Sequence, residues 1–203
     1  MLKGVMPAVV EVHSAQLPPD ARRRLTRADC SALEAAGLLD WERFELIDGE
    51  LIRKMPKSRL HANVLRHLCA WLRRVFGEGF VDQEVAIDLR ESINATNAPE
   101  PDAIVLRHPA EEFRIENPGA VDLLLVAEVA VTSQEYDLGA KAALYASAGI
   151  AEYWVLDLQD MRIVVHRNPA GERYESIIAY SADEAVSPLA AADSSIQLLD
   201  LAP

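Results

Sequence analysis

The sequence predicts a mixed α/β fold in which helices flank a central mixed β-sheet. Three observations lead to this fold class. The run Leu123–Ala130 is rich in Leu and Val, which is typical of a strand buried on both faces. The stretch after Ser58 has the apolar spacing of a long amphipathic helix. Further β-rich stretches with turn residues between them follow in the second half of the chain.

A chain of 203 residues is long enough for one good hydrophobic core. We expect an N-terminal arm over residues 1–24 and a single domain over residues 25–203. No apolar stretch approaches the ~18 residues that a membrane span needs, and the N-terminus lacks a signal-peptide pattern. We therefore expect a cytoplasmic protein without membrane contact, in which Cys30 and Cys69 are reduced, buried thiols on helices.

The charge distribution is uneven. The formal net charge is −12, which disfavours a general nucleic-acid coat protein. The stretch 53–74 contains seven Lys or Arg residues and no acid, so it carries +7 and leaves −19 for the rest of the chain. This asymmetry predicts one basic surface on an acidic body. A solvated helix face is the plainer interpretation of the same stretch.

The first elements are predicted from local signals. Thr26 and Asp29 form a capping-box pattern that begins a helix carrying Leu33, Ala36 and Leu39. Asp48-Gly49 lies between two β-prone runs, so the stretch 44–53 predicts a β-hairpin. Glu45, in its first strand, is an exposed strand acid unless a metal site lies beside it.

A long helix is predicted over residues 59–76, with Ser58 as its cap. Arg59, Arg66 and Arg73 recur every seven residues and therefore share one face. His61 falls on the apolar face at the start of the helix. It is either a hydrogen-bonded core histidine or a residue that lines a site.

The stretch 80–89 alternates between apolar and acidic residues, which predicts a half-buried strand. Gln83 is the polar member of its apolar side, where it either reaches a site or satisfies a buried backbone group. Asp102 then runs into a β-like segment, 103–106, and Glu128 is the one acid of the apolar run 123–130. A carboxylate buried in such a strand costs several kcal/mol unless it is paired or bound to a metal.

After this strand, Asp137 is expected to cap a helix over residues 138–148 that ends at Gly149. The plain interpretation of Lys141 is a surface ion pair with Asp137, four residues earlier on that helix. The stretches 152–157 and 161–166 predict a second hairpin, and 173–180 and 196–199 predict further short strands.

Asp102 and Glu128, at the edges of two core strands, could together hold a hard cation. Oxygen ligands with open water positions suit Mg²⁺ or Mn²⁺, and the sequence has no zinc motif. Such a cation can activate water and stabilise charge on a phosphodiester. Lys141 follows the Glu128 strand closely enough to join the two acids. No glycine-rich phosphate loop and no GxSxG nucleophile motif is present.

These motifs also occur in a characteristic order. They are the hairpin 44–51, Pro56 with Ser58 and His61, Pro101 with Asp102, Glu128 with Val129 and Ser133, then Asp137, Lys141 and Tyr145, and Gly149 with the stretch 152–157. In this order the chain resembles the Uma-type putative restriction endonuclease family of the PD-(D/E)XK nuclease superfamily, over roughly residues 26–200. The resemblance implies a restriction-endonuclease-like fold, with Asp102 and Glu128 as the metal-binding acids.

The superfamily usually places its lysine two residues after the glutamate, and this position is Ala130 here. The resemblance implies that Lys141, on the following helix, takes over that role. It also implies that His61 and Glu45 line the site. Val131 departs from the family pattern, in which a polar residue is common, and a supporting contact could be missing there.

The expected function is therefore a Mg²⁺- or Mn²⁺-dependent endonuclease that acts on DNA. Asp102 and Glu128 would hold the metal and Lys141 would position water and phosphate. The residues expected to line the site are Glu45, His61 and Gln83. The residues expected to bind the DNA backbone are Arg59, Arg66 and Arg73 on the basic face. Two alternatives stay open: a catalytically silent nuclease fold that serves homodimerisation or partner binding, and a nuclease that acts on RNA or small nucleotides.

Overall fold

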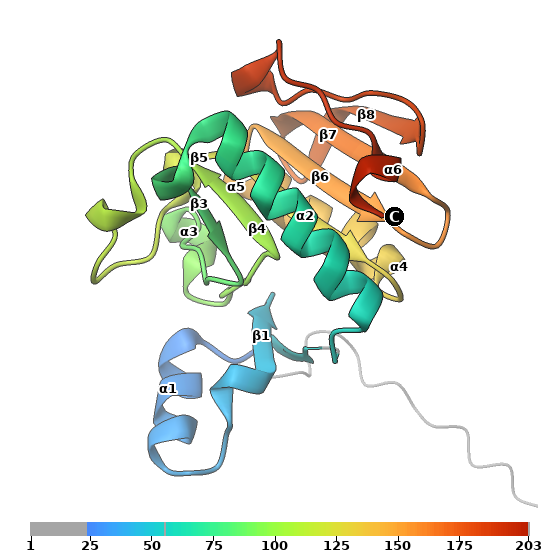
Figure 1. Cartoon of the computed structure of the whole chain (residues 1–203). Coiled ribbons are helices and arrows are strands. Elements are labelled where there is room, and N and C mark those ends of the chain that lie inside the picture. The colour runs from blue at the N-terminus through green and yellow to red at the C-terminus, as the bar shows by residue number, and fades with distance from the viewer. Residues whose placement is uncertain (1–23, 55, 203) are drawn as a thin grey trace, which may run out of the picture.

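A six-stranded mixed β-sheet forms the centre of the protein, in the strand order β3-β4-β5-β6-β7-β8 (Figure 1). This is a computed structural model, and it describes residues 24–54 and 56–202. The strands are β3 (Val81–Gln83), β4 (Ala103–Leu106), β5 (Leu123–Ala130), β6 (Glu152–Asp157), β7 (Arg162–Ala170) and β8 (Arg173–Ser181). Strands β5 and β6 are parallel and the other neighbours are antiparallel, so the predicted mixed sheet is confirmed.

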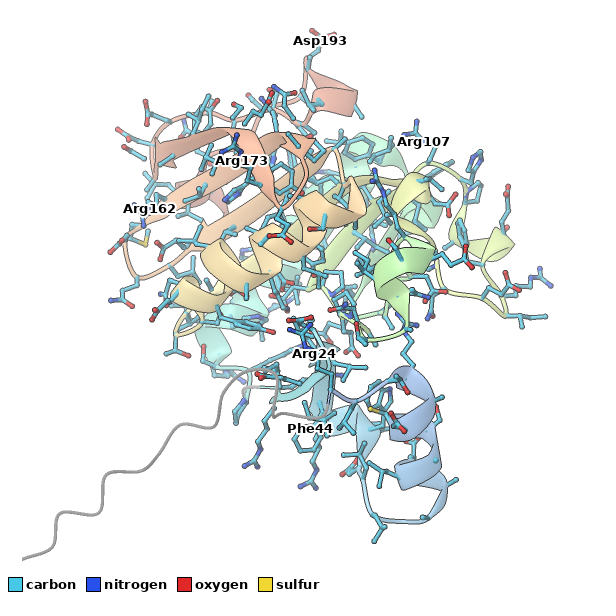
Figure 2. All side chains as sticks on the ribbon, turned by 180° about the vertical axis from the view of Figure 1, so that it is seen from behind. Arg24, Phe44, Arg107, Arg162, Arg173 and Asp193 are labelled. Atoms are coloured by element: carbon cyan, nitrogen blue, oxygen red, sulfur yellow. The ribbon has the colours of Figure 1, made fainter. Side chains whose placement is uncertain are left out.

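Helices cover both faces of the sheet. Helix α2 (Arg59–Phe76) crosses one face (Figure 1), and the segment that ends in α5 (Ala142–Ala148) crosses the other, as the view from behind shows (Figure 2). Alternate residues of β4 and β5 therefore enter two different cores. Val105 and Val129 pack on the α2 side, whereas Ile104 and Val126 pack on the α5 side. Burial on both faces explains why β5 is a continuous apolar run.

The N-terminal elements form a smaller unit at one end of the sheet (Figure 1). They are α1 (Arg27–Ala35), η2 (Trp41–Arg43), β1 (Phe44–Ile47) and β2 (Glu50–Arg53). Thr26 and Asp29 form the predicted capping box, and Asp48 and Gly49 turn the hairpin with φ of +50° and +76°. Leu46 is fully buried with Cys30 and Ala98 in a separate core cluster.

The remaining elements are short. They are η3 (Glu78–Phe80), α3 (Glu91–Asn94), η4 (Ala110–Glu112), η5 (Ala120–Asp122), α4 (Gln134–Tyr136), the π-helix η6 (Asp137–Lys141), η7 (Leu189–Ala191) and α6 (Leu198–Leu201). Over residues 24–54 and 56–202, none of the helices combines the length and apolar character that a bilayer span requires. The N-terminal arm expected over residues 1–24 lies outside the described residues, apart from Arg24.

Four predicted elements were wrong in part. The helix expected to carry Leu33, Ala36 and Leu39 ends at Ala35, because Ala36 is its C-cap and Gly37 follows with a φ of +71°. The strand expected over 80–89 ends at Gln83, because Glu84 adopts a φ of +56° that breaks the extended alternation. The stretch 196–199 is not a strand: Ile196 forms one bridge with Val186, and α6 follows. The helix expected over 138–148 begins earlier, at Gln134, so Asp137 lies inside the helical segment and does not cap it.

Candidate active site

The two predicted acids face each other where β5 ends and β4 begins. The antiparallel register pairs Ala103 with Ala127, which places Asp102 opposite Glu128. The Asp102 backbone NH donates to Glu128 Oε2 at 3.3 Å, and the Val129 NH donates to Asp102 Oδ2 at 2.8 Å. Each carboxylate is thus held by the backbone of the neighbouring strand, and both are buried, with 9% and 4% of their surface exposed.

Lys141 lies between two of the candidate acids. Its Nζ is 2.8 Å from Glu128 Oε1 and 3.1 Å from Glu45 Oε2. All three side chains are buried, and Tyr145 also donates its hydroxyl to Glu128 Oε1 at 3.1 Å. The interpretation of Lys141 as a surface ion pair with Asp137 was therefore wrong, because the helix turns its side chain into the protein.

A π turn brings Lys141 into this position. Residues Asp137–Lys141 form a π-helix between two α-helical segments, and both of its ends are buried. A π turn inserts an extra residue into the helix, so residues that share a face across it are spaced one residue further apart than in an α-helix. Such turns are frequent at functional sites. Sequence spacing alone predicts a regular helix here.

His61 joins the site from the first turn of α2. Ser58 caps this helix by accepting from the His61 backbone NH at 3.1 Å, and His61 Nε2 lies 3.0 Å from Asp102 Oδ2. The other ring nitrogen, Nδ1, is buried and has no hydrogen-bond partner among the described residues. His61 is thus both a hydrogen-bonded buried histidine and a neighbour of the candidate acids.

Three further side chains that sequence reasoning did not assign to the site complete it. Ser133 donates to Asp137 Oδ2 at 2.5 Å, and Asp137 is only 4% exposed. The Tyr136 ring centroid lies 6.0 Å from Lys141 Nζ, and its buried hydroxyl has no hydrogen-bond partner in the described part of the chain. The i, i+4 spacing of Asp137 and Lys141 was the available signal, but it was interpreted as a surface pair.

The ionisation behaviour of the site reflects an excess of buried negative charge. Burial raises the pKa of Glu128 well above its ordinary value, and it also raises the pKa values of Glu45 and Asp137. Burial alone would lower the pKa of Lys141, but the charges of Glu128, Glu45 and Asp137 outweigh it and raise that pKa well above its ordinary value. For Asp102, the desolvation that opposes ionisation is outweighed by His61 together with the Val129 NH and Lys141, so its pKa is lowered.

These side chains line one pocket of about 410 Å³. Its walls come from the hairpin, the connection into α2, the ends of β4 and β5, and the segment 131–141. The lining residues are Glu45, Ile52, Arg53, Lys54, Pro56, Lys57, Ser58, His61, Glu100, Asp102, Glu128, Val129, Val131, Thr132, Ser133, Tyr136, Asp137 and Lys141. Five predicted site residues, Asp102, Glu128, Lys141, His61 and Glu45, are therefore brought together.

Gln83 is not part of this group, which corrects its expected role. It is exposed at the end of β3 and does not line the pocket. The positive φ of Glu84 ends the strand directly after it, so the predicted alternation does not carry Gln83 inward.

The arginines of the predicted basic face, Arg59, Arg66 and Arg73, lie outside the pocket as well. Arg59 and Arg66 are exposed on α2, whereas Arg73 is half-buried and its Nε lies 3.4 Å from Glu78 Oε1. The cations that do line the pocket mouth are Arg53, Lys54 and Lys57. Lys54 pairs with Glu100 at 2.5 Å and Lys57 pairs with Glu84.

The donor set of the site is rich in carboxylate oxygen. Asp102 and Glu128 present two neighbouring carboxylates to the pocket, and such ligands suit Mg²⁺ or Mn²⁺, which keep several bound waters. Within residues 24–54 and 56–202, no group of three or more His, Cys, Asp or Glu side chains is arranged to enclose a metal ion. The arrangement therefore fits a cation that remains partly hydrated and does not fit a closed protein cage.

Comparisons with known proteins give a family and a fold. The model of the family described as Uma2, putative restriction endonuclease, matches residues 31–202. The crystal structure of a putative nuclease belonging to DUF820 from Anabaena variabilis ATCC 29413 superposes with a TM-score of 0.65. It is 19% identical in sequence, and the match covers 83% of this chain and 94% of that chain, which supports a shared fold. No curated protein matches the sequence significantly.

Proposed function

The chain belongs to the Uma2 family of putative restriction endonucleases, and from this membership we propose that it is a divalent-metal-dependent nuclease that hydrolyses DNA phosphodiester bonds. One observation carries the proposal. Four buried carboxylates, those of Glu45, Asp102, Glu128 and Asp137, line one pocket with the ammonium of Lys141. This group is rich in negative charge and opens to a space that a phosphate can enter.

The charge balance argues for a bound cation. Among the described residues, Lys141 is the only lysine or arginine that forms an ion pair with these four acids. Buried charges that lack a partner are costly, and the raised pKa values of Glu45, Glu128 and Asp137 reflect that cost. A divalent cation at the pocket would offset the excess negative charge.

Asp102 and Glu128 would hold the cation, because their carboxylates lie side by side on neighbouring strands. Bound Mg²⁺ or Mn²⁺ supplies Lewis-acid stabilisation of phosphate charge and lowers the pKa of a bound water. The backbone NH of Val129 and the ring of His61 both hold Asp102 Oδ2, at 2.8 and 3.0 Å, so they orient this carboxylate.

Lys141 would act as a hydrogen-bond donor to the phosphate or to the attacking water. The neighbouring carboxylates raise its pKa, so the side chain stays an ammonium and does not accept a proton at neutral pH. Glu45 and Glu128 hold Nζ between them at 3.1 and 2.8 Å, which limits its motion. Preorganised donors of this kind stabilise the charge that develops in the transition state.

A second candidate function is a nuclease fold without catalysis that binds a partner or a second copy. Three observations favour it. In the part of the chain that the structure describes, no three His, Cys, Asp or Glu side chains are placed so that they could hold a metal ion together, and Lys141 already pairs with two of the acids. The net charge of −12 also opposes binding to a long duplex.

Calorimetric titration with Mn²⁺ separates the two candidates. Wild type, Asp102→Asn and Glu128→Gln would be compared, with Glu135→Gln as the control because Glu135 is exposed and lies outside the pocket lining. Circular dichroism would verify that each variant is folded. We expect wild type and Glu135→Gln to bind Mn²⁺ and the other two to lose binding. Absence of Mn²⁺ binding by the wild type, with and without DNA, would overturn the nuclease proposal.

A further inference from the structure

The two candidate metal-binding acids are buried below the protein surface that a nucleic acid would contact. Asp102 and Glu128 line the pocket, yet only 9% and 4% of their surfaces are exposed. Ile52 and Arg53 of β2 contribute to one wall, and the segment 131–137 contributes to another. Among the described residues, the pocket between these walls gives a phosphodiester access to the two acids.

The size of the pocket limits what enters. Its volume of about 410 Å³ falls in the range that holds one small-molecule ligand, roughly 300–1,000 Å³, which is enough for about one nucleotide. It is far too small for two paired strands. Enzymes that act on nucleic acid inside such pockets bind an unpaired strand or extrude a nucleotide from the duplex, at a cost of a few kcal/mol for unstacking.

The lining chemistry suits one nucleotide. Arg53 is exposed at the pocket and has no ion-pair partner among the described residues, so it is available for a phosphate. The apolar side chains of Ile52 and Val131 and the ring of Tyr136 also line the pocket. Apolar and aromatic surface beside a cation is the combination that single-strand-binding sites use for bases and backbone.

The charge of the whole chain points in the same direction. Duplex binding depends on neutralising many phosphates along an extended surface. This chain has a net charge of −12, and the half-buried Arg73 already pairs with Glu78. The arginines left exposed on α2 are Arg59, Arg66 and Arg74. A single flexible strand needs fewer contacts of this kind and can reach the pocket without bringing a partner strand against the acidic body.

We infer that the pocket binds one nucleotide of an unpaired DNA strand, and that single-stranded or locally unpaired DNA is cleaved in preference to continuous duplex. This inference rests on the proposed nuclease function and specifies its substrate.

Cleavage of two closed circles tests the inference. Circular single-stranded DNA and the relaxed, covalently closed duplex of the same sequence would be incubated with the protein and Mn²⁺. We expect the single-stranded circle to be cut at least about tenfold faster, because a factor of ten corresponds to about 1.4 kcal/mol and unpairing a nucleotide costs more than that. Equal or faster cutting of the duplex would overturn the strand preference and leave the nuclease proposal standing. No cleavage of either circle would overturn both.

Binding provides a readout that does not depend on catalysis. Anisotropy of a labelled single-stranded 12-mer would be measured with Ile52→Trp, which fills the pocket, and with Ile178→Trp as a matched control on β8, where Ile178 is 48% exposed. Because the larger side chain would exclude the nucleotide from the pocket, we expect at least about tenfold weaker binding for Ile52→Trp and no change for the control. Wild-type affinity of Ile52→Trp would contradict the inference. Arg53→Ala, at an exposed position, gives the same test if Ile52→Trp does not fold.

Discussion

The carboxylate of Glu45 and the ammonium of Lys141 are 3.1 Å apart, although 96 residues separate them in the chain. Glu45 belongs to the N-terminal hairpin, and Lys141 belongs to the π turn in the helical segment that covers the sheet face opposite α2. Their contact joins the small N-terminal unit to the carboxylates at the sheet end. Since both side chains are buried, each needs the other to offset the cost of its own charge.

Removing the ammonium is expected to destabilise the protein. Lys141→Met leaves Glu45 and Glu128 without their ion-pair partner, and breaking a buried pair typically costs about 3–5 kcal/mol. Urea denaturation at neutral pH measures the loss. Lys54→Met is the matched control, because Lys54 pairs with Glu100 at the pocket mouth and such partly exposed pairs contribute about 0–1 kcal/mol. Equal losses in the free energy of unfolding for the two substitutions would contradict the inference that the buried ion pairs of Lys141 stabilise the fold.

The stability of the metal-free protein is expected to fall as pH rises above 4.5, the ordinary pKa of Glu128. Because burial raises the folded-state pKa of this carboxyl, the folded protein binds a proton more tightly than the unfolded chain between the ordinary and the raised value. Stabilisation from that proton is present at low pH and is lost through this window. Asp102, whose pKa is lowered, acts in the opposite sense below 3.8.

Glu128→Gln removes one titrating group and should flatten this pH dependence. Each proton of difference contributes about 1.4 kcal/mol per pH unit to the slope, so urea denaturation in EDTA at several pH values above 4.5 measures the change. Glu135→Gln, at an exposed position, should keep the wild-type slope. If the slopes of wild type and Glu128→Gln coincide, Glu128 does not titrate as its burial requires.

Two tyrosine hydroxyls in the same region should respond differently to removal. The Tyr136 hydroxyl is buried and lacks a hydrogen-bond partner among the described residues, so Tyr136→Phe should leave stability unchanged or raise it by up to about 1 kcal/mol. The Tyr145 hydroxyl donates to Glu128 at 3.1 Å, so Tyr145→Phe should cost about 1.5–3 kcal/mol. Thermal denaturation compares the two. A destabilised Tyr136→Phe would reveal a partner for that hydroxyl.

The arginines of α2 should contribute unequally to DNA affinity. Arg66 is exposed, and if it contacts a phosphate, Arg66→Ala should weaken binding and reduce the slope of log K against log salt by about 1. Arg73 is half-buried and pairs with Glu78, so Arg73→Ala should change the slope less. Anisotropy titrations over a range of salt concentrations measure both. Unchanged affinity in both variants would remove this face from the binding surface.

Local sequence signals predicted most of the fold. The helix expected over 59–76 and the strand expected over 123–130 have those bounds in the structure, and the Asp48-Gly49 hairpin forms as predicted. Caps, turn residues and apolar periodicity act within a few residues, so they can be found without knowledge of the tertiary structure. The failures have local causes that the pattern does not reveal, namely the positive φ of Glu84 and the π turn at Asp137–Lys141.

The candidate site was predicted from the cost of burying charge. Glu128 in an apolar strand and Asp102 at the start of another required partners, and this requirement alone identified two acids of the pocket. Gln83 was assigned to the site in error because alternation was extended beyond Glu84. Tyr136 and the cations Arg53, Lys54 and Lys57 were not assigned, because nothing in their spacing shows which surface they face.

The sequence by itself determined the helices, the strands and the two acids that need partners, because propensity, periodicity and the cost of a buried carboxylate are properties of short stretches. Only the tertiary structure decided which partners they find. The hairpin docks through the Asp48 NH on Asn97 Oδ1, at 2.6 Å, and through the Gly49 NH on the Thr96 carbonyl, at 2.8 Å. This docking brings Glu45 to Lys141, and such a contact between distant segments depends on the packing of the whole chain.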